Sequence, residues 1–129
     1  MHHCDHNEAL HPTRMDIPPE IRRYVIQLLN QTLACTVELR SHVKQAGWNV
    51  RGRDFAPLRA LFATMASELD AYTNLVAERI AVLGGIARGT APTAAMHSRV
   101  AASPDTLVDG QAQVGALVER FAPYTRAMR

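Results

Sequence analysis

Seven side chains that could bind a metal ion are crowded into the first eleven residues of the chain. They supply imidazole, thiol and carboxylate groups, and they are His2, His3, Cys4, Asp5, His6, Glu8 and His11. Side chains of these types bind zinc, cobalt and other transition metals. Their spacing matches no structural zinc motif. The sequence therefore leaves two interpretations open, a transition-metal site and a polar tail that binds metal only adventitiously.

Two later segments also contain residues that could do chemistry. The segment KQAGWNVRG, residues 44–52, includes the only tryptophan of the chain, Trp48, with Gly47 directly before it. The segment AERIAVLGG, residues 77–85, includes the carboxylate of Glu78. Trp48 could pack against a helical turn or lie beside a binding site, and both interpretations stay open.

Two long helices are predicted to position these segments. Apolar residues recur at three- and four-residue steps over 21–46 and again over 58–83, which is typical of helices packed on one face. The predicted inward residues of the first helix are Ile21, Val25, Leu28, Thr32, Cys35, Leu39, Val43 and Ala46.

The helix ends are predicted from residues that typically cap or break helices. The first helix should start near Pro19 and end at Gly47. Asp54 can cap the second helix, and the Gly84-Gly85 pair should end it.

The remainder of the chain predicts a connection and a shorter third helix. Residues 88–108 are rich in Ala, Thr, Ser and Pro, with room for a short helix over 91–99. A third helix should begin near Asp109, and Pro123 should bend or end it near Ala122 because its ring clashes with the preceding turn.

Composition is typical of a single all-α domain. Of 129 residues, 47% are apolar, 20% charged and only 5% aromatic. The net charge of +2 does not by itself indicate nucleic acid, and Arg14 is the only Lys or Arg among the first twenty residues. We interpret residues 1–17 as a polar, extended or disordered tail and residues 18–129 as the helical domain.

The predicted compartment rests on three features that the sequence lacks. There is neither a secretory leader nor an apolar run of 18 residues, and Cys4 and Cys35 do not make a disulfide framework. These features predict a cytoplasmic protein without a membrane partner.

The chain resembles the Dps family of small ferritin-like proteins of bacterial starvation and oxidative stress. The resemblance runs over LLNQTLACTVELRSHVKQAGWNVRG (28–52), then Phe55 with Leu58 and LF (61–62), then ELDAYTNLVAERIAVLGGIARGT (68–90). It continues more faintly in LVERFAPYTRAMR (117–129). It implies a ferritin-like antiparallel helical bundle, with two long helices and a shorter third helix. The family's fourth helix would follow Arg129 and is expected to be absent from this chain, either because a longer protein is truncated or because this relative is naturally shorter.

The resemblance also implies an assembly and an activity. Family members form hollow homo-dodecamers, oxidise ferrous iron with peroxide, store the ferric product and often bind DNA through a basic terminal tail. Their iron site lies at a two-fold dimer interface, where one subunit supplies two histidines and an acid and its partner supplies an aspartate and a glutamate. The polybasic tail is lacking here.

Four of the five iron-ligand positions are substituted in this sequence. The resemblance places the two histidines at Gly47 and Arg59, the acid of the same subunit at Ala63 and the partner's aspartate at Asn74. Only the glutamate, Glu78, is retained. Gly47 and Ala63 offer no donor atom, and Arg59 brings a fixed cation that repels ferrous iron. The expected result is a degenerate ferroxidase motif with Glu78 as a vestigial ligand and Trp48 as the neighbouring aromatic. Arg59 could also be a solvated helix residue or pair with Glu78 across an interface.

Three functions follow from these patterns. The first is a Dps-like stress-protection protein whose own ferroxidase site does not function. The second is an active iron-oxidising and iron-storage mini-ferritin that uses other ligands. The third is a non-catalytic scaffold with a metal-binding tail.

Overall fold

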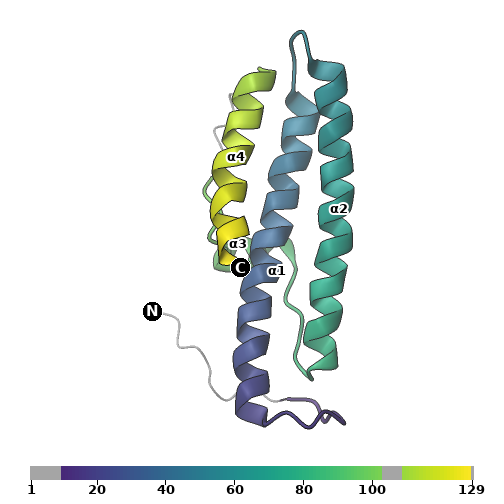
Figure 1. Ribbon diagram of the computed structural model, residues 1–129, viewed down its shortest axis with the longest axis vertical. Helices are drawn as coiled ribbons and strands as arrows, with labels where there is room; N and C mark the ends of the chain where they lie inside the picture. Colours follow the sequence, from purple (N-terminus) through teal and green to yellow (C-terminus); the bar gives the residue numbers. More distant parts are fainter. Residues whose placement is uncertain (1–9, 103–108, 129) are drawn as a thin grey trace.

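The fold is an all-α bundle built on an antiparallel hairpin of two long helices. The computed structural model describes residues 10–102 and 109–128. The helices are α1 (Pro19–Asn49), α2 (Phe55–Val82), α3 (Ala91–His97) and α4 (Gly110–Ala127). Figure 1 shows α1 and α2 side by side, with α4 starting beside the loop that joins them and running antiparallel to α1. The predicted hairpin is therefore confirmed. The described residues form no strand, only one isolated bridge between Arg51 and Asp109.

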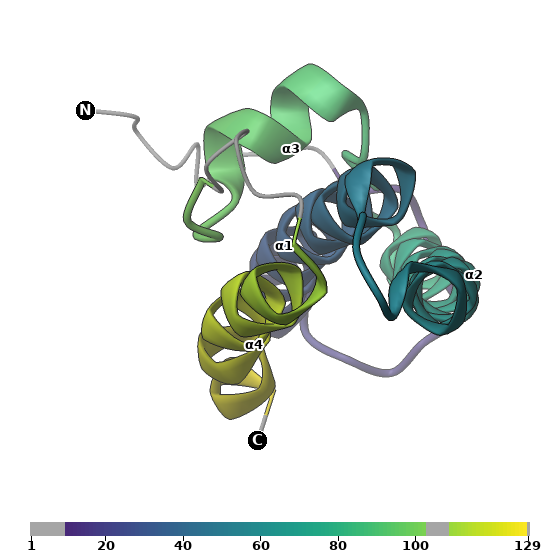
Figure 2. The same ribbon diagram turned by 90° about the horizontal axis from the view of Figure 1, so that it is seen from above.

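The other helices surround α1. Viewed from above, α2, α3 and α4 lie against different sides of α1 (Figure 2). This arrangement leaves a mainly apolar groove of about 390 Å³ between α2 and α4. It is lined by Met65, Glu68, Leu69, Tyr72, Phe121, Tyr124 and Met128.

The core consists of two clusters that follow the α1–α2 interface. One lies toward the hairpin loop and contains Val43, Ala46, Val50, Phe62, Ala66 and Leu117. The other lies toward the opposite end and contains Ile26, Leu33, Val76 and Ile80. Both are built from residues at three- and four-residue steps, so each helix presents one face inward.

The predicted inward face of α1 was correct only in its second half. Leu39, Val43 and Ala46 are buried as expected. Ile21 and Leu28 are about half exposed, and Ile26 and Leu33 are buried in their place. The first half of α1 is apolar on two sides, and the position of α2 decides which side is covered.

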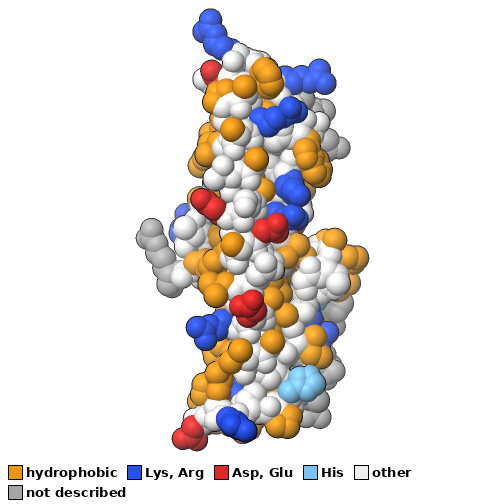
Figure 3. Space-filling view, turned by 90° about the vertical axis from the view of Figure 1, so that its right-hand side faces the viewer, with side chains coloured by type: hydrophobic (Ala, Val, Ile, Leu, Met, Phe, Trp, Pro, Cys, Tyr) orange, Lys and Arg blue, Asp and Glu red, His pale blue; other side chains and the backbone are white. Residues whose placement is uncertain are grey.

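The apolar side of α1 that α2 leaves uncovered forms an exposed stripe. Ile21, Tyr24 and Leu28 follow one another at three- and four-residue steps and are each at least half exposed. On α2, Leu75 and Val82 are about half exposed. Figure 3 shows hydrophobic side chains at many points along the face that α2 presents.

Three predicted helix boundaries needed correction. α1 continues past Gly47 to Asn49, because Gly47 has helical backbone and is buried. Asp54 precedes α2, but its side chain makes no capping hydrogen bond. Pro123 was predicted to bend or end the last helix, and the predicted end is not observed, because α4 passes through Pro123 to Ala127. Pro123 is exposed, so the carbonyl group that loses its N–H partner can reach water.

Other boundaries agree with the sequence. α1 begins at Pro19, and α2 ends just before Gly84, whose φ of 89° suits glycine. The side chain of Asp109 accepts a hydrogen bond from Ala112 N at 3.2 Å and caps α4. The expected short helix is observed at Ala91–His97.

The segment before α1 is docked rather than free over residues 10–13. Arg22, which is buried, donates from Nη1 to Leu83 O at 3.0 Å and to Thr13 Oγ1 and His11 O at 3.4 Å. His11 N donates to Gly84 O at 2.8 Å. Of the two predicted alternatives, extended or disordered, these residues fit the first, since they form no helix and Arg22 links them to the end of α2.

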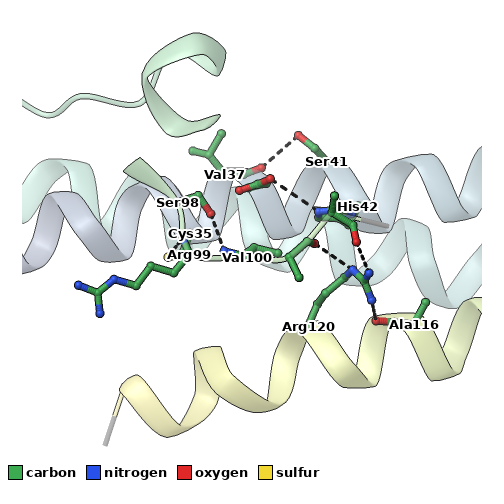
Figure 4. A network of polar contacts seen from close by, with 12 residues as sticks. Cys35, Val37, Ser41, His42, Ser98, Arg99, Val100, Ala116 and Arg120 are labelled. Carbon is green, nitrogen blue, oxygen red and sulfur yellow. Dashed lines mark hydrogen bonds and ion pairs between the residues drawn. The ribbon is translucent and has the colours of Figure 1, made fainter. Parts of the chain in front are cut away.

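A buried arginine holds the connection before α4. Arg120 donates from Nε to Ala101 O at 3.1 Å, from Nη1 to Ala116 O at 2.7 Å and from Nη2 to Ala102 O. Figure 4 shows Arg120 extending from α4 toward this connection, with His42 of α1 close by. Three carbonyl partners satisfy the guanidinium group, which explains how it is tolerated at 8% exposure.

His42 should make stability depend on pH. Burial lowers the pKa of His42 below its ordinary value, Glu38 opposes this shift with its carboxylate 3.8 Å away, and Arg120 adds to it. The unfolded chain therefore binds a proton more readily, so stability is lost as the pH falls below about 6.5. We expect the unfolding free energy, measured with urea at about pH 7.5 and 5.5, to fall less in His42→Gln than in the unmodified protein.

A matched control uses the exposed histidine of α3. His97→Gln should keep the acid sensitivity of the unmodified protein. Equal acid sensitivity in His42→Gln and the unmodified protein would contradict the prediction.

Candidate functional site

The predicted site residues Gly47, Arg59 and Ala63 line one groove between α1 and α2. The groove has a volume of about 370 Å³ and lies toward the hairpin loop. The lining residues are Arg40, Val43, Lys44, Gly47 and Trp48 of α1, and Arg59, Phe62, Ala63, Ala66, Ser67 and Asp70 of α2. We call it the hairpin groove.

Helical spacing brings these residues together. Arg40, Lys44 and Gly47 stand at steps of four and three, which places them on one face of α1. One face of α2 likewise contains Arg59, Ala63, Ala66 and Asp70, which stand at steps of four, three and four residues. The two faces meet because the helices are antiparallel.

The floor of the hairpin groove is apolar and tightly packed. Phe62, only 2% exposed, belongs to the core cluster beneath it. A Cβ atom added at Gly47 would lie 3.4 Å from Phe62 Cβ, which is ordinary van der Waals contact. Crowding at the first side-chain atom therefore does not require glycine at position 47.

Cations dominate the charge of the hairpin groove. Asp70 Oδ1 lies 2.5 Å from Arg40 Nε as an ion pair, although this buried Nε makes no hydrogen bond of regular geometry. Arg59 donates from Nε to Gly47 O at 3.2 Å. Within the part of the chain that the structure describes, no partner is found for the Lys44 ammonium or for the terminal nitrogens of Arg59.

Two predicted positions stand apart from the hairpin groove. Asn74 and Glu78 are exposed on α2 and are not among its lining residues. Asn74 is fifteen residues beyond Arg59, which is about 22 Å along a helix. One chain thus brings together Gly47, Arg59 and Ala63 with Trp48, and leaves the other two positions on the surface.

The metal-binding interpretation of the tail is not tested by the structure. His2, His3, Cys4, Asp5 and His6 lie outside the described residues. His11 is exposed. Over residues 10–102 and 109–128, no three His, Cys, Asp or Glu side chains are grouped so that they could hold a metal ion.

Sequence reasoning missed three charged residues of the hairpin groove. Arg40, Lys44 and Asp70 were not singled out, although each is a turn or two from a residue that was. Successive steps of three and four residues along the same helix face lead from Gly47 to Lys44 and Arg40, and from Ala63 to Asp70, and would have found them.

Comparisons with known proteins agree with this fold. The ferritin-like domain family matches residues 26–129. The DNA protection during starvation protein of Agrobacterium fabrum is 31% identical over 119 residues, covering 92% of this chain and 74% of that protein. DNA protection during starvation protein 1 of Deinococcus radiodurans is 30% identical over 105 residues, covering 81% of this chain and 51% of that protein.

Solved structures give the same result. DpsC from Streptomyces coelicolor superposes with a TM-score of 0.86 at 28% identity, covering 92% of this chain and 69% of that one. DpsA14 from the same organism gives 0.83 at 27% identity, covering 93% and 73%. No helix in the described part of the chain is long and apolar enough to cross a membrane. From the matched domain, the two sequence relatives and these superpositions it follows that the chain belongs to the Dps family of ferritin-like proteins.

Proposed function

We propose that this chain is a cytoplasmic, homo-oligomeric stress-protection protein that sequesters iron, and that its own ferroxidase positions do not hold ferrous iron. The observation that carries the second part is the chemistry of the hairpin groove, where Gly47, Arg59 and Ala63 stand at the expected ligand positions of one subunit and Lys44 adds a further cation to the lining. Iron enters this proposal as cargo.

The residues present do not fit a ferrous site. Iron in such a site takes imidazole and carboxylate ligands. Gly47 and Ala63 have no donor atom, and Arg59 donates hydrogen bonds but accepts none. The one carboxylate of the groove, Asp70, is engaged by Arg40 at 2.5 Å. Lys44 and Arg59 add positive charge where a divalent cation would have to lie.

Assembly is supported by apolar surface that one chain leaves uncovered. The α1 stripe of Ile21, Tyr24 and Leu28 is at least half exposed, and the groove between α2 and α4 is mainly apolar. Exposed apolar surface of this extent is typical of interfaces. By resemblance the assembly is a hollow dodecamer with a two-fold dimer interface.

DNA contact is a separate element of the proposal. The suggestion of DNA contact comes from the names of the sequence relatives, which are called DNA protection proteins. The basic tail that often binds DNA in the family is lacking here. Exposed arginines of the hairpin loop, Arg51 and Arg53, are the candidates for such contact. A gel-shift measurement at low and moderate salt tests it, since phosphate contacts weaken steeply with salt.

The iron proposal is tested by peroxide-dependent oxidation. Anaerobic protein is loaded with ferrous iron, mixed with peroxide, and followed by stopped-flow absorbance of the ferric product. We expect the unmodified protein to form ferric product no faster than protein-free buffer with the same iron and peroxide. Glu78→Ala should leave this rate unchanged, as should the control Glu68→Ala, which removes another exposed carboxylate of α2.

A variant that lacks residues 1–9 separates the tail from the hairpin groove. It retains His11, whose backbone is bonded to Gly84. Fast oxidation that survives this deletion but is lost in Glu78→Ala would refute the degenerate site. Fast oxidation that is lost with the tail would identify an active mini-ferritin that uses tail ligands, and metal binding without turnover would identify a scaffold.

A further inference from the structure

Two cations of the hairpin groove have no ion-pair partner within residues 10–102 and 109–128. They are Lys44 and Arg59, one on each wall, since Lys44 belongs to α1 and Arg59 to α2. The third cation, Arg40, is paired with the one acid of the lining, Asp70, at 2.5 Å. The groove of a single chain therefore keeps a net charge of +2, three cations against one acid.

An exposed carboxylate, Glu78, stands near the other end of α2. In the described part of the chain it too has no ion-pair partner. Arg59 is four residues from the first residue of α2, Phe55, and Glu78 is four residues from the last, Val82. The helix thus presents a cation and an anion at equal distances from its two ends.

This placement suits contact with a second copy of the chain. Most homo-oligomers pair identical surfaces about two-fold axes. When two α2 helices pack antiparallel with their ends aligned, which gives them the greatest overlap, each residue faces the one that lies equally far from the other end of the partner's helix. Arg59 of each subunit then faces Glu78 of the partner subunit, and this contact occurs twice in the dimer.

Short side chains between the two charges leave room for a partner helix. Four exposed residues follow Arg59 at steps of four, four, three and four, and they are Ala63, Ser67, Asp70 and Asn74. Aligned pairing places Ala63 opposite Asn74 of the partner subunit, and it places the Ser67 hydroxyl opposite a carboxylate, that of Asp70. The hollow of about 370 Å³ that small residues leave in one chain is space that a second chain can fill.

Two further features of the groove favour a protein partner. Trp48 lines it and is 69% exposed, and tryptophan is enriched at the buried centres of protein interfaces. Asp70 is close to the middle of α2, so aligned pairing brings its two copies near each other. Each is already neutralised by Arg40, so the two carboxylates do not oppose the contact.

We propose, building on the homo-oligomer proposed above, that the hairpin groove is one half of a two-fold interface between two copies of this chain. In it, the carboxylate of Glu78 of the partner subunit accepts hydrogen bonds from Arg59, with Lys44 as a second cation nearby. Arg59 is already oriented, because its Nε donates to Gly47 O at 3.2 Å and leaves its terminal nitrogens available for a carboxylate. A fixed ion pair thus stands where a bound metal ion would need to lie, and the dimer forms without metal.

Charge reversal in the full-length protein tests the ion pair. Arg59→Glu and Glu78→Arg each place like charges opposite one another, twice in every dimer. We expect the concentration of half-association, measured by sedimentation velocity over a dilution series, to rise at least about tenfold in each. The exchange variant Arg59→Glu/Glu78→Arg restores opposite charges and should return to within about threefold of the unmodified protein.

A matched control has the same composition and net charge as the exchange variant. It is Arg79→Glu/Glu78→Arg, which reverses one arginine and the same glutamate. Arg79 is exposed and follows Glu78 by one residue, so it points about 100° away around the helix. This control should associate as weakly as Glu78→Arg alone. A metal chelator should leave association of the unmodified protein unchanged.

Rescue in the exchange variant but not in the matched control supports the ion pair. Failure of the exchange to restore association, equal rescue by the control, or loss of association with chelator overturns it while leaving the homo-oligomer intact. A protein that is monomeric at every concentration refutes both. Circular dichroism shows whether the variants keep their helices. If a reversal unfolds the chain, Arg59→Gln and Glu78→Gln replace it, and unchanged association in both would overturn the proposal.

Discussion

Restoring four ligands together is expected to raise the rate of peroxide-dependent iron oxidation at least about a hundredfold over the unmodified protein. The substitutions are Gly47→His, Arg59→His, Ala63→Asp and Asn74→Asp. The estimate is conservative, because changes to residues that only support metal ligands already alter affinity about 10–100-fold. The rate is measured as ferric absorbance after rapid mixing, with Glu78 retained.

Two of the three substituted positions in the hairpin groove are exposed, and the third has room for a Cβ atom. A Cβ at Gly47 meets Phe62 Cβ at an ordinary 3.4 Å, and Arg59 and Ala63 are exposed. Replacing Arg59 removes a cation from the groove as well as adding an imidazole, so charge and donor set change together.

Partial variants separate the two effects. Gly47→His alone should restore little activity, because Arg59 still places a guanidinium group at the site. Light scattering must show that the variants assemble to the same extent, since the completed site needs residues from two subunits by resemblance. A quadruple variant that assembles normally and remains as slow as the unmodified protein would contradict the assignment of ligand positions.

The substitution Phe62→Ala is expected to lower the free energy of unfolding by about 3–5 kcal/mol. Phe62 is 2% exposed and lies in the core cluster formed by Val43 and Val50 of the α1 side and Leu117 of α4. Removing the ring leaves a cavity where three elements meet, and neighbouring helices can relax only in part. Urea unfolding monitored by circular dichroism measures the loss.

The neighbouring residue is a natural control for this prediction. Leu61 is 50% exposed on the same turn of α2, so Leu61→Ala should cost less than about 1 kcal/mol. Both variants are compared at one protein concentration, because assembly contributes to the apparent stability. Similar losses of unfolding free energy in the two variants would mean that packing around Phe62 does not make a special contribution to stability.

Local sequence signals determined the helices and most of their ends. Three- and four-residue periodicity over 21–46 and 58–83 predicted the hairpin, since a helix needs one continuous apolar face. The predicted end of α2 at Gly84 was nearly correct, because the positive φ that ends the helix there is a conformation that glycine adopts by itself, whatever the tertiary packing. The family followed from the segments around Trp48 and Glu78, which are contiguous in sequence.

Only the tertiary structure decided which faces are buried. The first half of α1 has apolar residues on two sides, and local periodicity cannot say that Ile26 rather than Ile21 meets α2. The inward position of Arg120 depends on carbonyl groups of residues 101 and 102, which are some eighteen residues away in sequence. Pro123 is tolerated because that part of α4 faces outward.

The candidate site was also predicted from the sequence only in part. Sequence alone predicted Gly47, Arg59 and Ala63 as substituted ligand positions, because the resemblance gives each of them a place in a motif. The charge of the hairpin groove required the structure, since Arg40 pairs with Asp70 across two helices, whereas Lys44 has no ion-pair partner among residues 10–102 and 109–128. Side-chain chemistry is local, whereas the net charge of a groove depends on which residues two helices bring face to face.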